Sequence, residues 1–306
     1  MSLPNLSIVK RTRKSFLYRA IIFLLSKETY STLYALFIYS KDALVLSFRY
    51  KVKKTLYSRL FTINGDNDNI MFSIIMPSYN RRKCISDAII SVLQQSYSNY
   101  ELIIVDDGSS DGSVEFIKEN FDRELKKGRI RLFSLPKNEG VCYARNFGLK
   151  RATGDTICYL DSDNKWCSWY LDYIAEHYRS APACKLAYTS MLSINKEINT
   201  CSVVGDIYDF DRMMEANYID MNVFSHKASL SEKYGDFDTE LKRLVDYELI
   251  MRFSYHYTPA FLQRIGAKYI YRRGIETITN SEELEYQRSL KLAHVKICNY
   301  RKKLDA

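Results

Sequence analysis

Two carboxylates stand one residue apart in Asp161–Asn164, directly after an apolar run. Alternation along an extended chain places residues i and i+2 on one face, so Asp161 and Asp163 are expected to point together. Two like charges that close repel one another unless a cation or hydrogen-bond donors lie between them. Mg²⁺ or Mn²⁺, held by carboxylates together with substrate phosphates, meets that need. The pair therefore predicts a metal and a phosphorylated ligand, with a solvated turn as the alternative.

From residue 71 the chain alternates short apolar runs with amphipathic segments, a pattern typical of a mostly parallel sheet with crossover helices. Strands are expected at 72–76, 102–105, 130–135 and 156–160. In such sheets ligands bind beyond the carboxyl ends of the strands. Four polar loops lie at these ends, namely Pro77–Arg81, Asp106–Gly112, Asn138–Gly140 and Asp161–Asn164. Their convergence favours a ligand site over a solvated turn.

Beyond residue 185 the pattern is less regular. Further strands are expected at 186–194, 221–228 and 269–271, and short helices at 209–216 and from Asp246. A last helix is expected from about Ser281, because Asn280 and Glu283 have capping-box spacing.

The composition describes a globular chain whose basic charge is concentrated at one end. The 306 residues are 46% hydrophobic, which is enough for a sizeable core. The seven cysteines are scattered and contain no Cys-x-x-Cys pair, which argues against a disulfide framework or a zinc site and favours a reducing cytoplasm. Residues 1–60 hold 12 Lys and Arg against two acidic residues, so they account for the net charge of +9.

Residues 1–70 are expected to form a basic extension of amphipathic helices. No apolar run in it reaches the length of a spanning helix. Residues 1–60 are expected either to lie on an anionic membrane surface or to pack on the following domain or a second subunit. Nucleic acid is not expected as a partner, because apolar runs follow phosphates poorly. Deleting residues 1–60 would weaken binding to anionic liposomes only in the first case.

Six segments, in this order, resemble the family 2 glycosyltransferases with a GT-A fold. They are Phe72–Arg81, Val105–Ser113, Gly140–Gly148, Leu160–Asp163, Gly235–Asp238 and Val245–Arg252. Each is a common string alone, but six with matching order and spacing are specific. The resemblance covers about residues 71–275 and implies an α/β, Rossmann-like domain, a mostly parallel sheet with helices on both faces. The extension at 1–70 precedes it, and a C-terminal helix at 276–306 follows it.

The resemblance implies a nucleotide site on the first loops. In it Tyr79 stacks on the base, with Pro77 and Asn80 beside it. Asp107 accepts a hydrogen bond from a base N–H, unless it is only a turn or helix cap. Arg145 lies near the base or the diphosphate, with a surface ion pair as the alternative.

The resemblance also implies a metal site and a catalytic base. Asp161 binds the ribose, and with Asp163 it binds Mn²⁺ or Mg²⁺ at the diphosphate. Asn164 stands where many members carry a third acid, so metal binding depends mainly on Asp163. Asp246 matches the general base of the family, with a helix N-cap as the alternative. Because a helix N-terminus lowers a carboxyl pKa, Asp246 needs desolvation to serve as a base.

Three further residues are candidates for the donor or acceptor pocket. Glu248 faces away from Asp246 on a helix, so it is either structural or an acceptor contact. His226 and Arg273 are pocket candidates, although a lone His near a strand is more often structural.

The implied activity is that of an inverting, metal-dependent, hexosyltransferase-like glycosyltransferase. Its nucleotide-sugar donor is expected to carry UDP, or dTDP, whose thymine offers the same N–H edge. The acceptor is expected to be a hydroxyl of a surface glycan or lipid-linked saccharide, at the cytoplasmic face of the cell membrane. The alternatives are a non-catalytic GT-A protein that binds a nucleotide sugar or a partner, with homo-oligomers formed through the extension, and a sugar-1-phosphate nucleotidyltransferase. The latter needs a Gly-rich basic phosphate loop, which Pro77–Asn80 is not.

Overall fold

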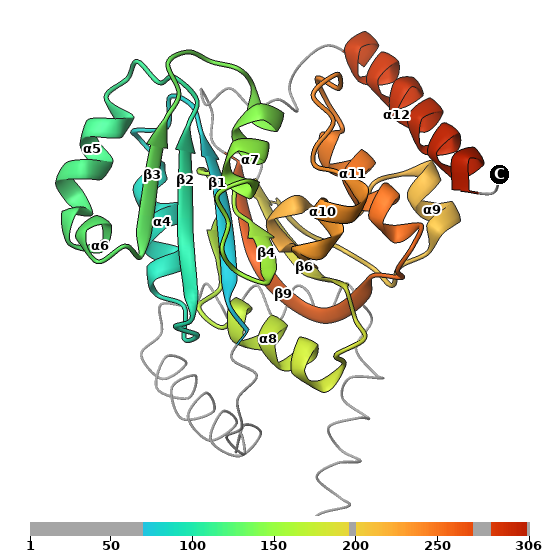
Figure 1. Ribbon diagram of the computed structural model, residues 1–306, viewed down its shortest axis with the longest axis horizontal. Helices are drawn as coiled ribbons and strands as arrows, with labels where there is room; N and C mark the ends of the chain where they lie inside the picture. Colours follow the sequence, from blue (N-terminus) through green and yellow to red (C-terminus); the bar gives the residue numbers. More distant parts are fainter. Residues whose placement is uncertain (1–69, 196–199, 272–282, 305–306) are drawn as a thin grey trace, which may run out of the picture. The chain divides into compact units, whose positions relative to one another are not determined.

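The computed structural model describes residues 70–195, 200–271 and 283–304. The predicted basic extension, apart from Ile70, and the candidate Arg273 lie outside these residues. Nine strands of the described chain form one sheet with helices on both faces (Figure 1). The order across the sheet is β3-β2-β1-β4-β8-β6-β9-β5, and β7 pairs with β6.

The first half of the sheet is parallel, as the alternating pattern predicts. Its strands are β1 Phe72–Ser78, β2 Tyr100–Asp106, β3 Ile130–Ser134 and β4 Thr156–Tyr159. Strand β1 lies between β2 and β4, and it runs parallel to both. Strand β3 runs parallel to β2. The carboxyl ends of all four strands therefore meet at one edge.

The second half of the sheet mixes strand directions. Its strands are β5 Lys165–Trp166, β6 Leu186–Asn195, β7 Thr200–Val204, β8 Phe224–Lys227 and β9 Ala260–Tyr271. Strand β8 runs antiparallel to β4 and β6, whereas β6 and β9 are parallel. The strand expected at 221–228 is only partly present. Met221–Val223 forms a 3-10 turn, η1, because the Asp220 carboxylate accepts from the Asn222 N–H at 2.8 Å and caps it.

Nine helices lie in the described part of the chain. They are α4 Ile85–Leu93, α5 Ser113–Asn120, α6 Asp122–Lys126, α7 Val141–Leu149, α8 Tyr170–Ser180, α9 Phe210–Glu215, α10 Ser229–Tyr234, α11 Val245–Ser254 and α12 Glu283–Leu304. Helix α12 packs on α11, and its Ala293 and Ile297 are buried in the apolar cluster that also holds Ile250. None of the described helices combines the length and apolarity that crossing a bilayer requires.

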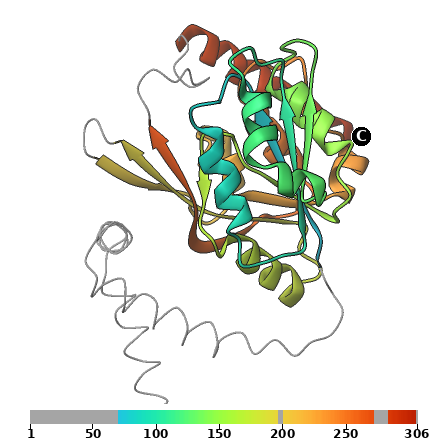
Figure 2. The ribbon, with the colours of Figure 1, turned by 90° about the vertical axis from the view of Figure 1, so that its left-hand side faces the viewer.

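Alternation along the central strands divides the apolar core into two clusters. On β1, Ile74 and Met76 face the cluster that contains α4 and α8, while Ile75 faces the cluster that contains α7 and α11. Figure 2 shows α4 and α7 on opposite sides of these strands. Because both faces of β1 are covered, its centre, Ile74–Met76, is a continuous apolar run rather than an alternating pattern. The sheet is thereby a rigid platform for the loops at its carboxyl edge.

Candidate active site

A cavity of about 850 Å³ opens at the carboxyl edge of the parallel strands. All four predicted polar loops contribute to its wall, and so do η1 and the start of α11. Of the predicted site residues, the cavity brings together Pro77, Tyr79, Asp107, Arg145, Asp161, Asp163 and Asp246. The convergence expected from the sequence is therefore present.

The loop after β1 supplies an exposed aromatic ring. Pairing with β4 ends at Ile75 and Tyr159, so the missing N–H of Pro77 interrupts no bond to that strand. Tyr79 follows and is 42% exposed at the cavity. An open phenol face of this kind is suited to stacking on a planar base.

Asn80 does not line the cavity and instead holds two loops together. Its backbone has φ +52°, a left-handed conformation that Asn tolerates better than most residues. Its N–H donates to Ser109 Oγ at 2.8 Å, and its Oδ1 accepts from the Ser110 N–H at 2.9 Å. Asn80 thus fixes the loop after β1 against the loop after β2, and a direct contact with a nucleotide stays a prediction.

Asp107 joins the loop after β2 to the start of α7. Its carboxylate accepts from the N–H groups of Glu139 and Gly140, both at 2.8 Å. These bonds go to the two residues that precede α7, so they tie two loops together and are not bonds to the first turn of a helix. Each oxygen retains a second lone pair and the residue lines the cavity, so its contact with a base N–H stays a prediction. Gly108 is required beside it, because a Cβ there would lie 2.5 Å from the Lys137 carbonyl carbon.

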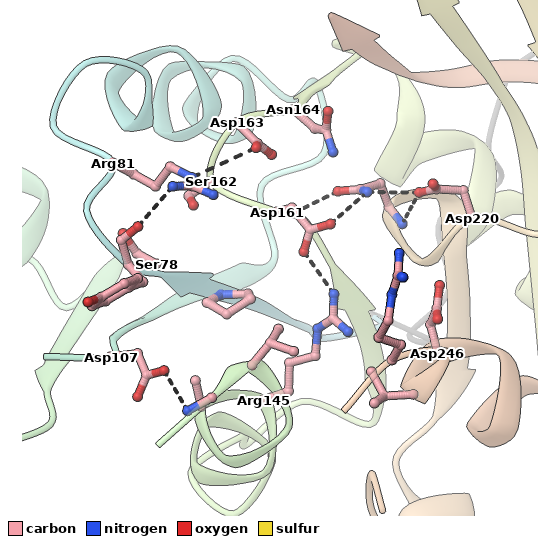
Figure 3. A pocket seen from close by; sticks show the side chains of 18 of the residues that line it. Ser78, Arg81, Asp107, Arg145, Asp161, Ser162, Asp163, Asn164, Asp220 and Asp246 are labelled. Atoms are coloured by element: carbon pink, nitrogen blue, oxygen red, sulfur yellow. Dashed lines mark hydrogen bonds and ion pairs between the residues drawn. The ribbon is translucent and has the colours of Figure 1, made fainter. Parts of the chain in front are cut away.

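The acidic pair lies in a turn, so the expected extended alternation is wrong. Strand β4 ends at Tyr159, and the Asn164 N–H donates to the Asp161 carbonyl at 3.0 Å. The two side chains consequently have separate cationic neighbours (Figure 3). Arg145 Nη2 donates to Asp161 Oδ1 at 2.9 Å, and Arg81 Nε lies 3.8 Å from Asp163 Oδ2.

The carboxylate oxygens of Asp161 and Asp163 could bind a metal ion only if a phosphate supplied further ligands. Among the described residues there is no group of three or more His, Cys, Asp or Glu side chains placed to hold a metal. Asp161 and Asp163 present carboxylate oxygens to the cavity. Mg²⁺ and Mn²⁺ accept such a pair when substrate phosphates complete the coordination. The two carboxylates would suit a divalent ion whose remaining ligands come from a diphosphate, and the metal itself stays a prediction.

Asp246 is the second residue of α11 and its half-buried carboxyl group lines the cavity (Figure 3). Burial raises the pKa of Asp246, and the nearby Arg145 guanidinium offsets part of that rise. Desolvation thus raises the pKa of Asp246 by more than the helix N-terminus lowers it, as a carboxylate that serves as a base requires. Arg145 itself is 5% exposed and packs over the Phe237 ring, so its ion pair is not a surface pair.

Two other candidates lie away from the cavity. His226 is fully buried on β8, where its Nε2 is hydrogen-bonded to the Tyr159 hydroxyl at 2.8 Å. Burial lowers the pKa of His226 to about 4, so the ring is a neutral core group. Glu248 is buried on α11 and paired with Arg252 at 2.8 Å. Glu248 was expected to be either structural or an acceptor contact, and its burial and its ion pair are typical of a structural residue.

The cavity also contains polar residues that the sequence did not single out. Asp220 and Asn222 enter from η1, and Lys242 and Arg243 from the loop before α11. Burial raises the pKa of Asp220 to about 6, and the nearby Asp161 and Asp246 charges add to the rise. The spacing of Asp220 and Asn222 is that of an Asx cap. The sequence pattern at 221–228 favoured a strand and so concealed that signal.

Comparisons with known proteins agree with this geometry. A family model described as glycosyl transferase family 2 matches residues 73–201. Escherichia coli K12 WcaA, a protein assigned to colanic acid biosynthesis as a glycosyl transferase, is 31% identical over 195 residues, 62% of this chain and 68% of WcaA. Escherichia coli WfgD, a UDP-Glc:alpha-D-GlcNAc-diphosphoundecaprenol beta-1,3-glucosyltransferase, is 44% identical over 99 residues, 32% of this chain and 37% of WfgD.

Several other matches are short relative to the proteins concerned. An uncharacterized glycosyltransferase of Haemophilus influenzae is 48% identical over 94 residues, which is 31% of this chain but 36% of that protein. Among solved structures, S. aureus TarS in complex with UDP-GlcNAc superposes with a TM-score of 0.61 at 20% identity, over 73% of this chain and 66% of that one. This likeness confirms the predicted α/β GT-A fold class.

Proposed function

Because the chain belongs to glycosyltransferase family 2, we propose that it transfers a sugar from UDP to a hydroxyl of a surface glycan or lipid-linked saccharide, with inversion at the sugar carbon. The observation that carries the proposal is the convergence of Tyr79, Asp161 and Asp246 on one cavity. The name of WfgD, which specifies a UDP-sugar and a lipid-linked saccharide, supports this choice of substrates. A dTDP donor would offer the same base edge.

The donor nucleotide binds along the first three loops. Tyr79 stacks on the uracil with its exposed face. Asp107, with its lone pairs that the Glu139 and Gly140 amides leave unused, accepts from the uracil N–H. Asp161 is 34% exposed at its side chain, so its carboxylate is accessible to the ribose hydroxyls. These contacts orient the diphosphate toward Asp163.

The transfer step uses Asp246. Its carboxylate takes the proton of the acceptor hydroxyl while that oxygen attacks the sugar carbon from the face opposite the nucleotide. The bond from the sugar carbon to the diphosphate oxygen breaks in the same step, and UDP leaves with the bonding electrons. The raised pKa of Asp246 makes its carboxylate a stronger base than an ordinary aspartate.

Asp163, with Asp161, would hold Mn²⁺ or Mg²⁺ at the diphosphate. Such an ion supplies positive charge where the leaving diphosphate accumulates negative charge. The chain's own contribution is to aim these oxygens at the cavity while Arg81 and Arg145 balance their charge.

Calorimetry with UDP and turnover of a panel of UDP-sugars test the donor site. Asp163→Ala should abolish the Mn²⁺ dependence of UDP binding and strongly reduce turnover, and chelation of divalent ions should do the same to the wild type. If Asp163→Ala binds UDP and turns over like the wild type, the proposed diphosphate site is wrong.

Asp246→Asn tests the base against a matched acid at another helix start. Loss of general-base catalysis should reduce kcat by about 10²–10⁴-fold, while UDP affinity is retained. Asp209 caps α9, where its Oδ1 accepts from the Arg212 N–H at 2.9 Å, and it does not line the cavity. Asp209→Asn should leave kcat within a factor of about two. The N-cap position of α11 is Leu244, so Asp246 is not the N-cap that the sequence offered as the alternative. Equal losses of kcat in the two variants would contradict the assignment of Asp246 as the base.

A further inference from the structure

The side chain of Asn222 connects two carboxylates of the cavity. Its Nδ2 donates to Asp161 Oδ2 at 3.0 Å and to Asp220 Oδ1 at 2.8 Å. Its Oδ1 accepts from the Asp161 backbone N–H at 2.6 Å. The residue is 3% exposed, so these bonds are shielded from water. One amide therefore fixes both the backbone and the carboxylate of Asp161.

The backbone around Asn222 is held as firmly as its side chain. Its N–H donates to Asp220 Oδ1 at 2.8 Å, and its carbonyl accepts from Trp166 Nε1 at 2.7 Å. The amide cannot be reversed, because its oxygen would then face the carboxylate oxygens of Asp161 and Asp220. Both N–H protons are used, one for each carboxylate.

The chemistry of this position suits asparagine and few other residues. Aspartate would bring a third carboxylate to the two already there, and serine has a single proton to donate. With alanine at position 222, the Asp161 carboxylate would keep one side-chain partner in the described part of the chain, Arg145, which donates to Oδ1. The second oxygen, Oδ2, would then be free to rotate away from the ribose.

We propose that Asn222 is a positioning residue for nucleotide binding, which holds the Asp161 carboxylate in the orientation that accepts from the ribose hydroxyls. This inference rests on the proposed function, in which Asp161 contacts the ribose. Asn222 acts through Asp161 and does not itself touch the donor. Its effect should consequently appear in ligands that carry ribose hydroxyls and vanish in ligands that lack them.

Calorimetry on Asn222→Ala with UDP and with 2′,3′-dideoxy-UDP tests this. The affinity for UDP should fall about tenfold, and the affinity for dideoxy-UDP, already weak in the wild type, should change less than about twofold. The donor KM should rise in parallel with the UDP Kd at nearly constant kcat, whereas damage to the fold would lower the active fraction without this ligand dependence. Asp220→Ala, which removes the acceptor that orients the Asn222 amide, should reproduce a smaller part of the effect and gives a second route if Asn222→Ala does not fold.

Asn99→Ala is the matched control. The Asn99 amide donates to the Ile70 carbonyl at 3.2 Å, at the opposite end of β1 from the cavity, so its loss should leave both affinities unchanged. Equal weakening of UDP and dideoxy-UDP, or unchanged UDP affinity in Asn222→Ala, would overturn the positioning role alone. A wild-type protein that binds no UDP would overturn the proposed function and this inference with it.

Discussion

Replacing Glu248 by alanine measures how far the helix that carries Asp246 depends on a buried ion pair. Glu248 and Arg252 lie one turn apart on α11 and are 5% and 7% exposed. Arg252 donates through Nε and Nη2 to the two Glu248 oxygens at 2.8 and 2.9 Å. The same guanidinium also donates to the Gly235 carbonyl at 2.8 Å. The pair thus ties α11 to the chain that follows α10.

The expected loss of stability follows from this geometry. Removing one partner of a buried pair costs roughly 3–5 kcal/mol, because the other charge stays buried without it. Arg252 keeps carbonyl acceptors in Tyr234, Gly235 and Asp236, so the lower end, about 3 kcal/mol, applies. At about 2–4 °C per kcal/mol for a domain of this size, the Tm of Glu248→Ala should fall by about 6–12 °C.

Thermal melts followed by circular dichroism provide the assay, and Glu176→Ala provides the control. Glu176 pairs with Arg179 at 3.5 Å on α8, but its side chain is 42% exposed. A surface pair contributes about 0–1 kcal/mol, so Glu176→Ala should lower the Tm by at most about 4 °C. UDP affinity below the melting range should be unchanged in both variants, because neither residue lines the cavity. A Tm loss in Glu248→Ala no larger than in Glu176→Ala would refute the argument, and an altered acceptor KM at full stability would restore the acceptor-contact role.

Two further predictions concern a loop junction and a buried ring. Gly108→Ala should reduce UDP affinity at least about tenfold, because the new Cβ would lie 2.5 Å from the Lys137 backbone. Gly128→Ala is the control, because Gly128 has a similar φ of +71° but no atom within 4 Å of a Cβ. It should lose only about 1–2 kcal/mol of stability to backbone strain and keep its UDP affinity. The depressed pKa of His226, about 4, means that the unfolded chain takes up its proton first, so the stability due to this group is present above about pH 6.5 and is lost as the pH falls through 4. His226→Gln should therefore show a smaller decrease in Tm over that range than the wild type.

The parallel half of the fold follows from local pattern, and so does the location of the cavity. The apolar runs within β1, β2 and β4 are continuous because both faces of these strands are covered, which makes them visible in the sequence. The polar loops that follow these strands therefore lie together at the carboxyl edge of the sheet. Helix α11 is predictable for a different reason, since Leu249, Ile250 and Phe253 mark a buried face.

The partners of the polar residues could not be predicted, because they depend on contacts between distant parts of the chain. Asp161 and Asp163 lie near each other in sequence, yet each is neutralised by an arginine from another loop or helix. The turn that separates them begins two residues after β4 ends. Local alternation describes side-chain direction only while the strand continues, so it gives no information at this turn.

Asn222 extends this point to the site as a whole. It lies 61 residues from Asp161 in sequence, and its amide nevertheless fixes both the backbone N–H and the carboxylate of that residue. Neither its residue type nor its spacing marks it, because an asparagine two residues after a capping aspartate is common in any fold. What distinguishes it is that the amide serves two carboxylates of one cavity at once. A residue with this function is recognisable only once strand order has brought β4 and β8 together, because η1, which carries Asn222, leads directly into β8.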